Sequence, residues 1–396
     1  MTPVELSRTV LRAMRQAVDA GELRVDVDVD AEAGHGVRGV RVERPRPGGR
    51  GDYATNVALQ IARSAGRPPR QVAEVLSPRL AAEPGIARVD ITGPGFLNIT
   101  LAGARDEALV ALVREILERG HCYGHVHPDT GALAQIHVPR EIRAVVVADS
   151  ARRILRSQGV LVRVTCDDAP DPAWTDALDV LDVRVDAHGR PPQPLPTLRP
   201  VPAEGAREPH PVLRLGRDAA RWALLHPAPH DHPRITPEQG GDQHLVQRES
   251  NPLFRVRYAH ARSRALTRNA ADLGFTAAPG NLAAPGDTDA PHHCTTPRNT
   301  TPHNTTPTPL LDALAAHPAV LASAARHRAP DRLARHLVVT ADAFLAFQSA
   351  PQGQVLPVGD EKPLAAHRAR LALAEAAGTV LAGGLALLGI SAPDHL

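Results

Sequence analysis

The sequence predicts a multidomain α+β protein with three parts: an N-terminal α+β domain over residues 1–125, a small α/β unit over 126–246, and an all-α helical bundle over 247–396. Three observations predict this class. Short strand-like runs are mixed with helical spacing in the first part, one strand–helix–strand pattern follows, and the ordered stretches after Pro252 have helical spacing only. A chain of 396 residues is also long enough for two or three domains of ordinary size.

The N-terminal part mixes helices with short strands. "LRVDVDVD" alternates strictly from Leu23 to Asp30, which predicts a strand with one solvated face. Its Asp26, Asp28 and Asp30 lack the glycine and the closing glutamate of a calcium-binding loop, so they predict a wet strand face and no metal site. The other expected elements are helices at Val4–Ala20, Ala54–Ser64 and Arg70–Ala81, a helix ending on Gly120, and strands in "IARVDITG" and "GFLNITLAG".

The middle part contains one strand–helix–strand signal. "ALAQIHV" and "VLVRVTC" have strand composition, and they flank the helical stretch "EIRAVVVADSARRILRSQG". "ALDVLDVRVDA", residues 177–187, is a further strand candidate. Proline dominates from Arg190 to Pro211, and "GRDAARWALLH" predicts a short helix from Gly216.

The C-terminal part is predicted to be helical apart from one segment. Its helices are expected at Pro252–Leu273, Pro309–Ala316, Val320–His327, Asp331–Ser349 and Leu364–Leu388. Residues 275–308 are rich in Pro, Thr, Asn and His, which predicts a mobile, disordered linker. Because nothing in such a segment holds ligands in a tetrahedron, its His292, His293, Cys294 and His303 are not predicted to bind a metal.

Composition limits where the protein acts and what it binds. The formal net charge is +2, so any surface that binds nucleic acid must be local. Three scattered cysteines without CxxC spacing favour a reducing compartment. The N-terminal stretch lacks the apolar run of a signal peptide, and we expect no segment with the roughly 18–20 apolar residues of a membrane span. These features predict a soluble cytoplasmic protein without a membrane partner.

The stretch "NPLFRVRYAHAR" combines a good helix start with several arginines. Asn251 suits the N-cap and Pro252 the first helical position. At about 100° per residue, one arc of this helix carries Phe254, Tyr258, Ala261 and Ala265. The arginines beside the arc are Arg257, Arg264 and Arg268 on one side and Arg255 and Arg262 on the other. Such a strip suits a phosphate backbone with bases stacked between the rows, while spacing alone slightly favours a core stripe with a solvated basic rim.

The same stretch resembles the helix that opens the anticodon-binding domain of arginyl-tRNA synthetases, because Tyr258 to Arg262 match that family's Tyr-Ala-His-Ala-Arg without a change. Four further blocks are similar to the family in the same order: Gly51–Ala62, Gly93–Leu101, Gly216–Leu225 and Leu385–Pro393. The resemblance implies an N-terminal add-on domain that grips the outer corner of tRNA, a Rossmann-type catalytic domain that binds ATP, and a DALR-type helical anticodon-binding domain.

The catalytic parts of that family are altered in this chain. At the family's His-x-Gly-His signature, His137 keeps the first histidine, Pro139 replaces the glycine, and Arg140 replaces the second histidine. Proline adds a ring and removes a donor where glycine lets the nucleotide approach the backbone. The stretch before Gly216 has no lysine for the family's Lys-Met-Ser-Lys loop, and too few residues separate Arg140 from Gly216 for a doubly wound domain. We therefore expect a shrunken, degenerate Rossmann-like remnant without catalytic residues, in which His137 is a relic or a packed histidine.

The resemblance also implies which residues contact RNA. In the add-on domain they are Asn56, Phe96 and Asn98, although Phe96 is equally compatible with a core position. In the helix they are Arg255, Arg257, Tyr258, His260, Arg262, Arg264 and Arg268. The first two of these arginines replace polar or aromatic residues, which raises phosphate affinity and lowers sequence specificity. Leu345 and Gln348 stand where the family tends to have a histidine and a tyrosine, which predicts weaker base stacking.

These expectations predict a non-catalytic protein that binds tRNA or a tRNA-like RNA and uses no cofactor. One alternative is a divergent but active arginine–tRNA ligase, which would use ATP. A second alternative is a protein-interaction module, in which the old RNA surface binds a protein such as a true synthetase or a tailoring enzyme.

Overall fold

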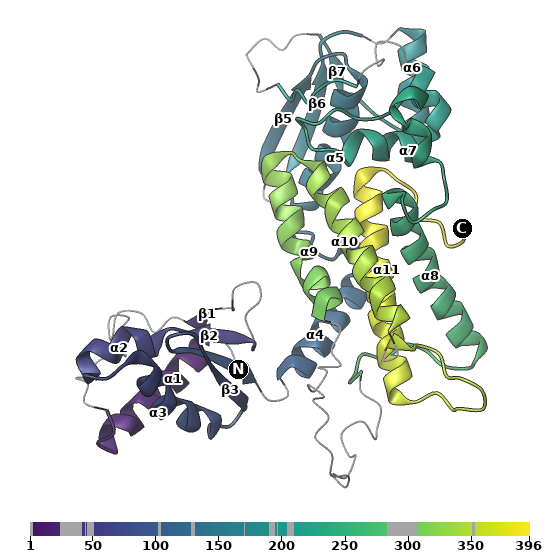
Figure 1. Ribbon diagram of the computed structural model, residues 1–396. Helices are drawn as coiled ribbons and strands as arrows, with labels where there is room; N and C mark the ends of the chain where they lie inside the picture. Colours follow the sequence, from purple (N-terminus) through teal and green to yellow (C-terminus); the bar gives the residue numbers. More distant parts are fainter. Residues whose placement is uncertain are drawn as a thin grey trace. The chain divides into compact units, whose positions relative to one another are not determined.

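Residues 1–109 and 110–396 form two separate units in the computed structural model of the chain (Figure 1). The structure describes residues 3–23, 42–43, 45, 51–101, 104–127, 131–169, 171–189, 195, 197–203, 210–282, 308–350 and 353–396. Several residues that the sequence singled out lie outside these ranges, namely Asp26, Asp28, Asp30, His292, His293, Cys294 and His303.

The N-terminal unit packs helices on one antiparallel sheet. Its described strands are β1 (Val42–Glu43), β2 (Tyr53–Thr55), β3 (Ile86–Thr92) and β4 (Phe96–Leu101), in the order β1-β2-β4-β3. Its helices are α1 (Pro3–Asp19), α2 (Val57–Ala65) and α3 (Pro69–Ala81). Leu6 and Met14 of α1, Leu76 of α3, and Leu97 and Ile99 of β4 are buried in one hydrophobic core. The apolar residues of the helices and those of the strands therefore pack together in a single hydrophobic core.

Strand pairing moves the start of α2 along the chain. The sequence predicts a helix from Ala54, and this boundary is wrong. Ala54 and Thr55 pair with Asn98 and Leu97 of β4, so they complete β2. The helix begins at Val57, whose backbone N–H donates to the Thr55 hydroxyl at 3.3 Å.

The second unit begins with a small parallel sheet. Its strands are β5 (Leu133–Val138), β6 (Leu161–Cys166) and β7 (Ala187–His188), in the order β5-β6-β7. α4 (Ala104–Arg119) precedes the sheet in the chain, α5 (Ile142–Ser157) packs against it, and α6 (Pro172–Val180) and α7 (His210–Leu225) come later in the chain. The predicted strand–helix–strand unit is thus confirmed as β5-α5-β6. A kink at Gly216, with φ of 69°, divides α7.

The strand predicted over residues 177–187 is largely wrong. Most of its valines and leucines belong to α6 or the turn after it, and only Ala187 remains in a strand. The cause is a strong helix start that the alternation concealed. Asp171 accepts a hydrogen bond from the backbone N–H of Trp174 at 3.0 Å, and Pro172 occupies the first helical position.

Helices fill the rest of the second unit. They are α8 (Pro252–Asp272), α9 (Thr308–His327), α10 (Pro330–Ser349) and α11 (Ala365–Leu388). The sequence predicts two helices, over Pro309–Ala316 and Val320–His327, where α9 runs unbroken with Pro318 inside it. Proline at this position leaves the Leu314 carbonyl without its helical donor. The Tyr123 hydroxyl donates to that carbonyl oxygen at 3.3 Å, so the helix continues.

The segment predicted as a linker is ordered where it begins. Phe275 is buried, and the backbone N–H of Ala278 donates to the Arg368 carbonyl of α11 at 3.1 Å. The disordered linker predicted from residue 275 therefore cannot start before residue 283. Residues 283–307 lie outside the described part of the chain.

One helix corrects the expectation about apolar length. α11 has 24 residues and a window with a mean hydropathy of 1.8, so it is long and apolar enough to cross a membrane. However, 78% of that window is buried in the unit. A side chain at Gly384 would lie 2.4 Å from Leu337 Cδ2, and one at Gly378 would lie 2.0 Å from Ser263 Oγ. These close approaches identify α11 as the core helix of the bundle.

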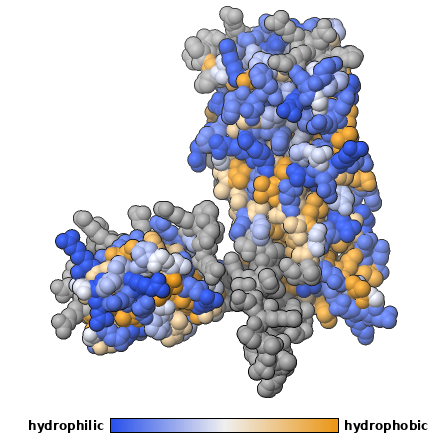
Figure 2. Space-filling model, viewed as in Figure 1, coloured by the Kyte–Doolittle hydropathy of each residue, from blue (hydrophilic) through white to orange (hydrophobic). Residues whose placement is uncertain are grey.

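The surface of the second unit is mixed in character. In the view of Figure 2, the end that carries the sheet is mostly hydrophilic, whereas the helical part has hydrophobic patches between hydrophilic ones. Val339 of α10, for example, is 57% exposed. The predicted class of a multidomain α+β protein with a C-terminal helical part is confirmed.

Candidate functional site

α8 is held at its start by the cap that the sequence predicts. The Asn251 side-chain oxygen accepts from the backbone N–H of Leu253 at 3.0 Å. Its Nδ2 donates to the carbonyl oxygens of His244 and Val246 at 3.1 and 2.9 Å. The side that faces the bundle core carries Leu253, Val256, Ala259, Leu266 and Ala270. The helix is therefore fixed in rotation, which decides what it shows to solvent.

Phe254 and Tyr258 lie on the outer side of α8. Their rings stack with centroids 5.7 Å apart and an interplanar angle of 21°, and Tyr258 is 41% exposed. Because the core side of the helix is a different one, the interpretation of these aromatics as a core stripe is wrong. The stacked pair offers a flat apolar surface of the kind on which bases stack.

Arg257, Arg264 and Arg268, here named the first arginine row, lie on one side of the aromatic pair. Arg264 Nε is 3.2 Å from a carboxylate oxygen of Asp394, and Arg268 donates to the Asp394 carbonyl oxygen at 3.3 Å. The Arg257 side chain is 25% exposed, and its guanidinium is 3.7 Å from Asp218 of α7. The first row therefore faces Asp218 of α7 and residues that follow α11.

Arg255 and Arg262, the second arginine row, lie on the opposite side and face α10. Arg255 forms an ion pair with Asp342 at 3.2 Å. Arg262 lies against Gln348, whose side-chain oxygen accepts from Arg262 Nε at 2.7 Å when the amide is oriented to satisfy both groups. Leu345, on the same helix as Gln348, is half-buried. The two rows frame the aromatics as helical geometry predicts.

His260 points away from this surface. It is 4% exposed, and its Nδ1 donates to the Pro393 carbonyl oxygen at 3.0 Å. Burial lowers the pKa of His260, so the ring is neutral near pH 7. Its position makes it a support for the segment after α11 and leaves it out of reach of a ligand on the outer side of α8.

The predicted RNA residues of the N-terminal unit are divided between surface and interior. Asn56 is exposed, and Phe96 is 41% exposed at the start of β4, so the core interpretation of Phe96 is wrong. The pair Thr55↔Leu97 is the last in the β2–β4 register, which brings Asn56 and Phe96 opposite each other one residue further on. Asn98 is instead 5% exposed and donates to the Thr92 hydroxyl at 2.7 Å.

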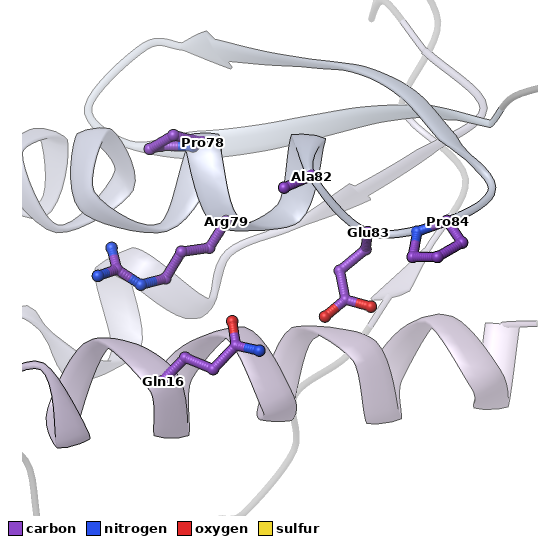
Figure 3. A pocket seen from close by; sticks show the side chains of 6 residues that line it. All are labelled: Gln16, Pro78, Arg79, Ala82, Glu83 and Pro84. Carbon is purple, nitrogen blue, oxygen red and sulfur yellow. The ribbon is translucent and has the colours of Figure 1, made fainter.

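A surface pocket of about 400 Å³ lies between α1 and α3 in the same unit (Figure 3). Arg79 on its wall donates to both carboxylate oxygens of Glu22, at 3.0 and 2.8 Å, and Arg12 pairs with Glu83 at 3.1 Å. The bond from Arg79 lowers the pKa of Glu22. Because these arginines and glutamates are already paired with one another, the pocket offers little to a charged ligand.

The signature residues lie at the carboxyl end of the parallel sheet. His137 is 6% exposed, with Nδ1 2.8 Å from the Thr165 hydroxyl and Nε2 3.0 Å from Asp167 Oδ1. Arg140 forms an ion pair with Asp171, and its guanidinium carbon lies 5.2 Å from the centre of the Trp174 ring. Both residues therefore contact other side chains of the chain itself.

Glu141 closes the N-terminus of α5. Its carboxylate accepts from the backbone N–H groups of Arg143 and Ala144 at 3.0 and 2.8 Å. These are the free donors that a helix N-terminus offers to a phosphate. Burial raises the pKa of Glu141, while the two backbone bonds oppose that rise.

A proline-rich segment crosses the same place. Thr197 pairs with His137, and the backbone N–H of Leu198 donates to the His137 carbonyl oxygen at 3.0 Å. The fully buried Arg143 donates to the Val201 carbonyl oxygen at 2.7 Å. With a carboxylate on the helix and a strand-like segment beside it, the described residues do not fit the phosphates of ATP here.

No group of three or more His, Cys, Asp and Glu residues in the described ranges is arranged to hold a metal ion. The sequence patterns missed the acidic residues that pair with the two arginine rows: Asp218, Asp342 and Asp394. Each comes from an element far away in the chain. The only available signal is the lack of any acid from Asn251 through Ala270, which requires that partners come from elsewhere.

Two family descriptions match the chain. "Arginyl tRNA synthetase N terminal domain" matches residues 8–101, and "DALR anticodon binding domain" matches residues 256–396. The arginine–tRNA ligase of Renibacterium salmoninarum is 28% identical with 100% of each chain covered, in an alignment of 585 positions against the 396 residues of this chain. The arginine–tRNA ligase of Frankia alni is 41% identical over 172 residues, which cover 41% of this chain but only 29% of the relative.

Two solved structures share the fold. The arginyl-tRNA synthetase of Thermus thermophilus has a TM-score of 0.55 at 15% identity, with 100% of each chain covered. That of Plasmodium falciparum has a TM-score of 0.57 at 9% identity and covers 100% of this chain and 99% of its own. At such identities the likeness concerns the fold alone.

Proposed function

The chain belongs to the arginyl-tRNA synthetase family, and from this premise we propose that it binds tRNA or a tRNA-like RNA in the cytoplasm without activating an amino acid. Contact is made by the outer side of α8 and by the end of the N-terminal sheet that carries Asn56 and Phe96. The small parallel sheet is the remnant of a Rossmann-type catalytic domain.

One observation carries the proposal. The helix N-terminus that follows the signature position is closed by Glu141, which occupies the donors of Arg143 and Ala144. A phosphate at this place would have to displace a carboxylate that carries the same charge. Pro139 also offers no backbone donor, so this helix start lacks free hydrogen-bond donors for a phosphate.

The arrangement on α8 supports binding to the RNA backbone. Two arginine rows flank a stacked aromatic pair, so phosphates can be contacted on both sides of a base-stacking surface. Buried Asn98 supports the turn that carries Phe96 and is not itself a contact. The replacement of stacking residues by Leu345 and Gln348 reduces base readout, so shape and charge dominate recognition.

Filter binding to tRNA at rising salt tests the RNA proposal. Affinity is expected to fall steeply, because each phosphate contact adds about 0.7–0.9 to the slope of log K against log salt. Arg262→Glu combined with Arg264→Glu should weaken binding about tenfold or more and reduce the slope by about one for each arginine. Arg326→Glu, at an exposed arginine of α9, is the matched control and should change little.

Three outcomes separate the alternatives. A flat salt dependence, or equal effects of the α8 variant and the Arg326→Glu control, would contradict RNA binding by α8. If the wild type does not bind RNA but captures a protein through α8, the interaction module is the better account. If the wild type binds RNA strongly and the α8 variant binds with the same affinity, another surface of the protein binds the RNA.

The alternative of an active ligase is favoured by one observation, the similarity to the Renibacterium arginine–tRNA ligase along its whole length. ATP–pyrophosphate exchange with arginine decides between the two functions. We expect no exchange above that of a reaction without protein, because the Glu141 carboxylate occupies the backbone donors that would bind a phosphate. Exchange that depends on both arginine and the protein would overturn the non-catalytic proposal, and Glu141→Gln should then alter it.

A further inference from the structure

Residues 391–395, here named the latch segment, follow α11 and run beside α8, where Figure 1 also places the end of the chain. Asp394 contacts two members of the first arginine row, with its carboxylate on Arg264 and its carbonyl oxygen on Arg268. Arg268 also lies 3.3 Å from His395 Nδ1. The segment thus covers the same arginines that the proposed function assigns to phosphate.

The base of the latch segment is firmly held. The backbone N–H of Ser391 donates to Asp218 at 3.2 Å, and its hydroxyl donates to the other carboxylate oxygen of Asp218. Arg257 joins this anchor, since its guanidinium donates to the Ser391 hydroxyl at 3.4 Å. Pro393 is fixed by the hydrogen bond from buried His260. These contacts use side chains from α7 and α8 that are themselves largely buried.

The tip of the latch segment is held much more weakly. Asp394 and His395 are exposed, and the side chains of Arg264 and Asp394 are 46% and 52% exposed. An exposed ion pair of this kind contributes little to stability and is screened by salt. A segment with a fixed base and a loose acidic tip can therefore leave the arginines without unfolding the bundle.

We propose that the latch segment is an autoinhibitory contact, in which Asp394 competes with RNA phosphates for the first arginine row. The inference rests on the proposed RNA binding by α8. A polyanion that offers several phosphates displaces the single carboxylate, while the Ser391 anchor stays in place. Asp394 thereby lowers the affinity for RNA and selects ligands that engage both arginine rows at once.

The test is the affinity of Asp394→Asn for tRNA at low salt. Removing the competing charge should raise affinity about two- to fivefold, the change expected when an exposed ion pair no longer opposes binding. Asp312→Asn removes the same charge from an exposed position of α9 and is the matched control.

The outcomes distinguish the latch from RNA binding itself. A gain confined to Asp394→Asn supports the latch, and so does binding by this variant when the wild type shows none. Equal affinities of Asp394→Asn and Asp312→Asn, with tRNA bound by both, overturn the latch and leave the proposed function standing. Absence of tRNA binding by the wild type and both variants overturns both.

Discussion

Buried arginines in this chain mostly form hydrogen bonds and ion pairs with other residues of the chain. Arg143 is fully buried and donates to five backbone carbonyl oxygens, those of Val201, Leu224, Pro227, Ala228 and Asp231. Arg221 is also fully buried and contacts Asp149 at 2.7 Å. A buried guanidinium is tolerated only when its donors are satisfied, and here they are satisfied internally. Exposure, and not arginine content, therefore identifies the surface that meets a ligand.

A single hydroxyl supports α9 at its proline. Burial raises the pKa of Tyr123 to about 12, so the hydroxyl keeps its proton and remains a donor to the Leu314 carbonyl oxygen. Tyr123→Phe should lower the free energy of unfolding by about 1–2 kcal/mol, because a buried carbonyl loses its donor. Urea denaturation measures this, with Tyr258→Phe, at an exposed ring, as the matched control.

The same hydroxyl allows a double-mutant test. Pro318→Ala restores a backbone N–H that can donate to the Leu314 carbonyl oxygen within the helix. The cost of Tyr123→Phe should therefore be smaller in the Pro318→Ala background than in the wild type. An unchanged cost in that background would mean that the ring, and not the hydrogen bond, stabilises this part of the helix.

At the level of elements, sequence patterns predicted the helices and strands whose start signals and periodicity agree. α8 has an Asn-Pro start and full helical spacing, and β3 and β4 flank a Gly-Pro-Gly turn. The failures occurred where a tertiary contact overrides a local signal. Tyr123 lets α9 pass through Pro318, and pairing with β4 takes the first residues of the predicted second helix.

The residues of the candidate site likewise fall into those that sequence reasoning places correctly and those that it misses. Helical geometry places the aromatic pair and the two arginine rows correctly, because all of these residues share one element. It cannot reveal Asp218, Asp342 or Asp394, since each comes from an element distant in the sequence. Nor can a motif alone tell that Asn98 and His260 point inward, since burial depends on the neighbouring strand and on the segment after α11.

On the scale of the whole molecule, we expect the two units to differ in how their stability responds to acid. The second unit buries His317 and His336, whose rings lie 5.3 Å apart, and His317 also stacks on Tyr123. His317 Nδ1 and His336 Nε2 have no hydrogen-bond partner. The described residues of the N-terminal unit include no histidine. Protonation of the two buried histidines should therefore destabilise the second unit. The described part of the N-terminal unit has no histidine that could be protonated.

Burial lowers the pKa of His317 to about 3 and that of His336 to about 4, against 6.5 for the free side chain. Below pH 6.5 the unfolded chain then binds protons that the folded chain does not, so stability falls as pH falls. Between pH 7 and pH 5 each ring should cost the second unit about 2 kcal/mol. Urea unfolding at several pH values should show the transition of the second unit moving to lower urea while that of the N-terminal unit stays nearly constant. His317→Phe keeps an aromatic ring beside Tyr123 and should reduce the pH dependence by about one proton, whereas His327→Phe, at an exposed position, should leave it unchanged. Equal pH dependence in these two variants would show that the buried ring is not what makes the second unit sensitive to acid.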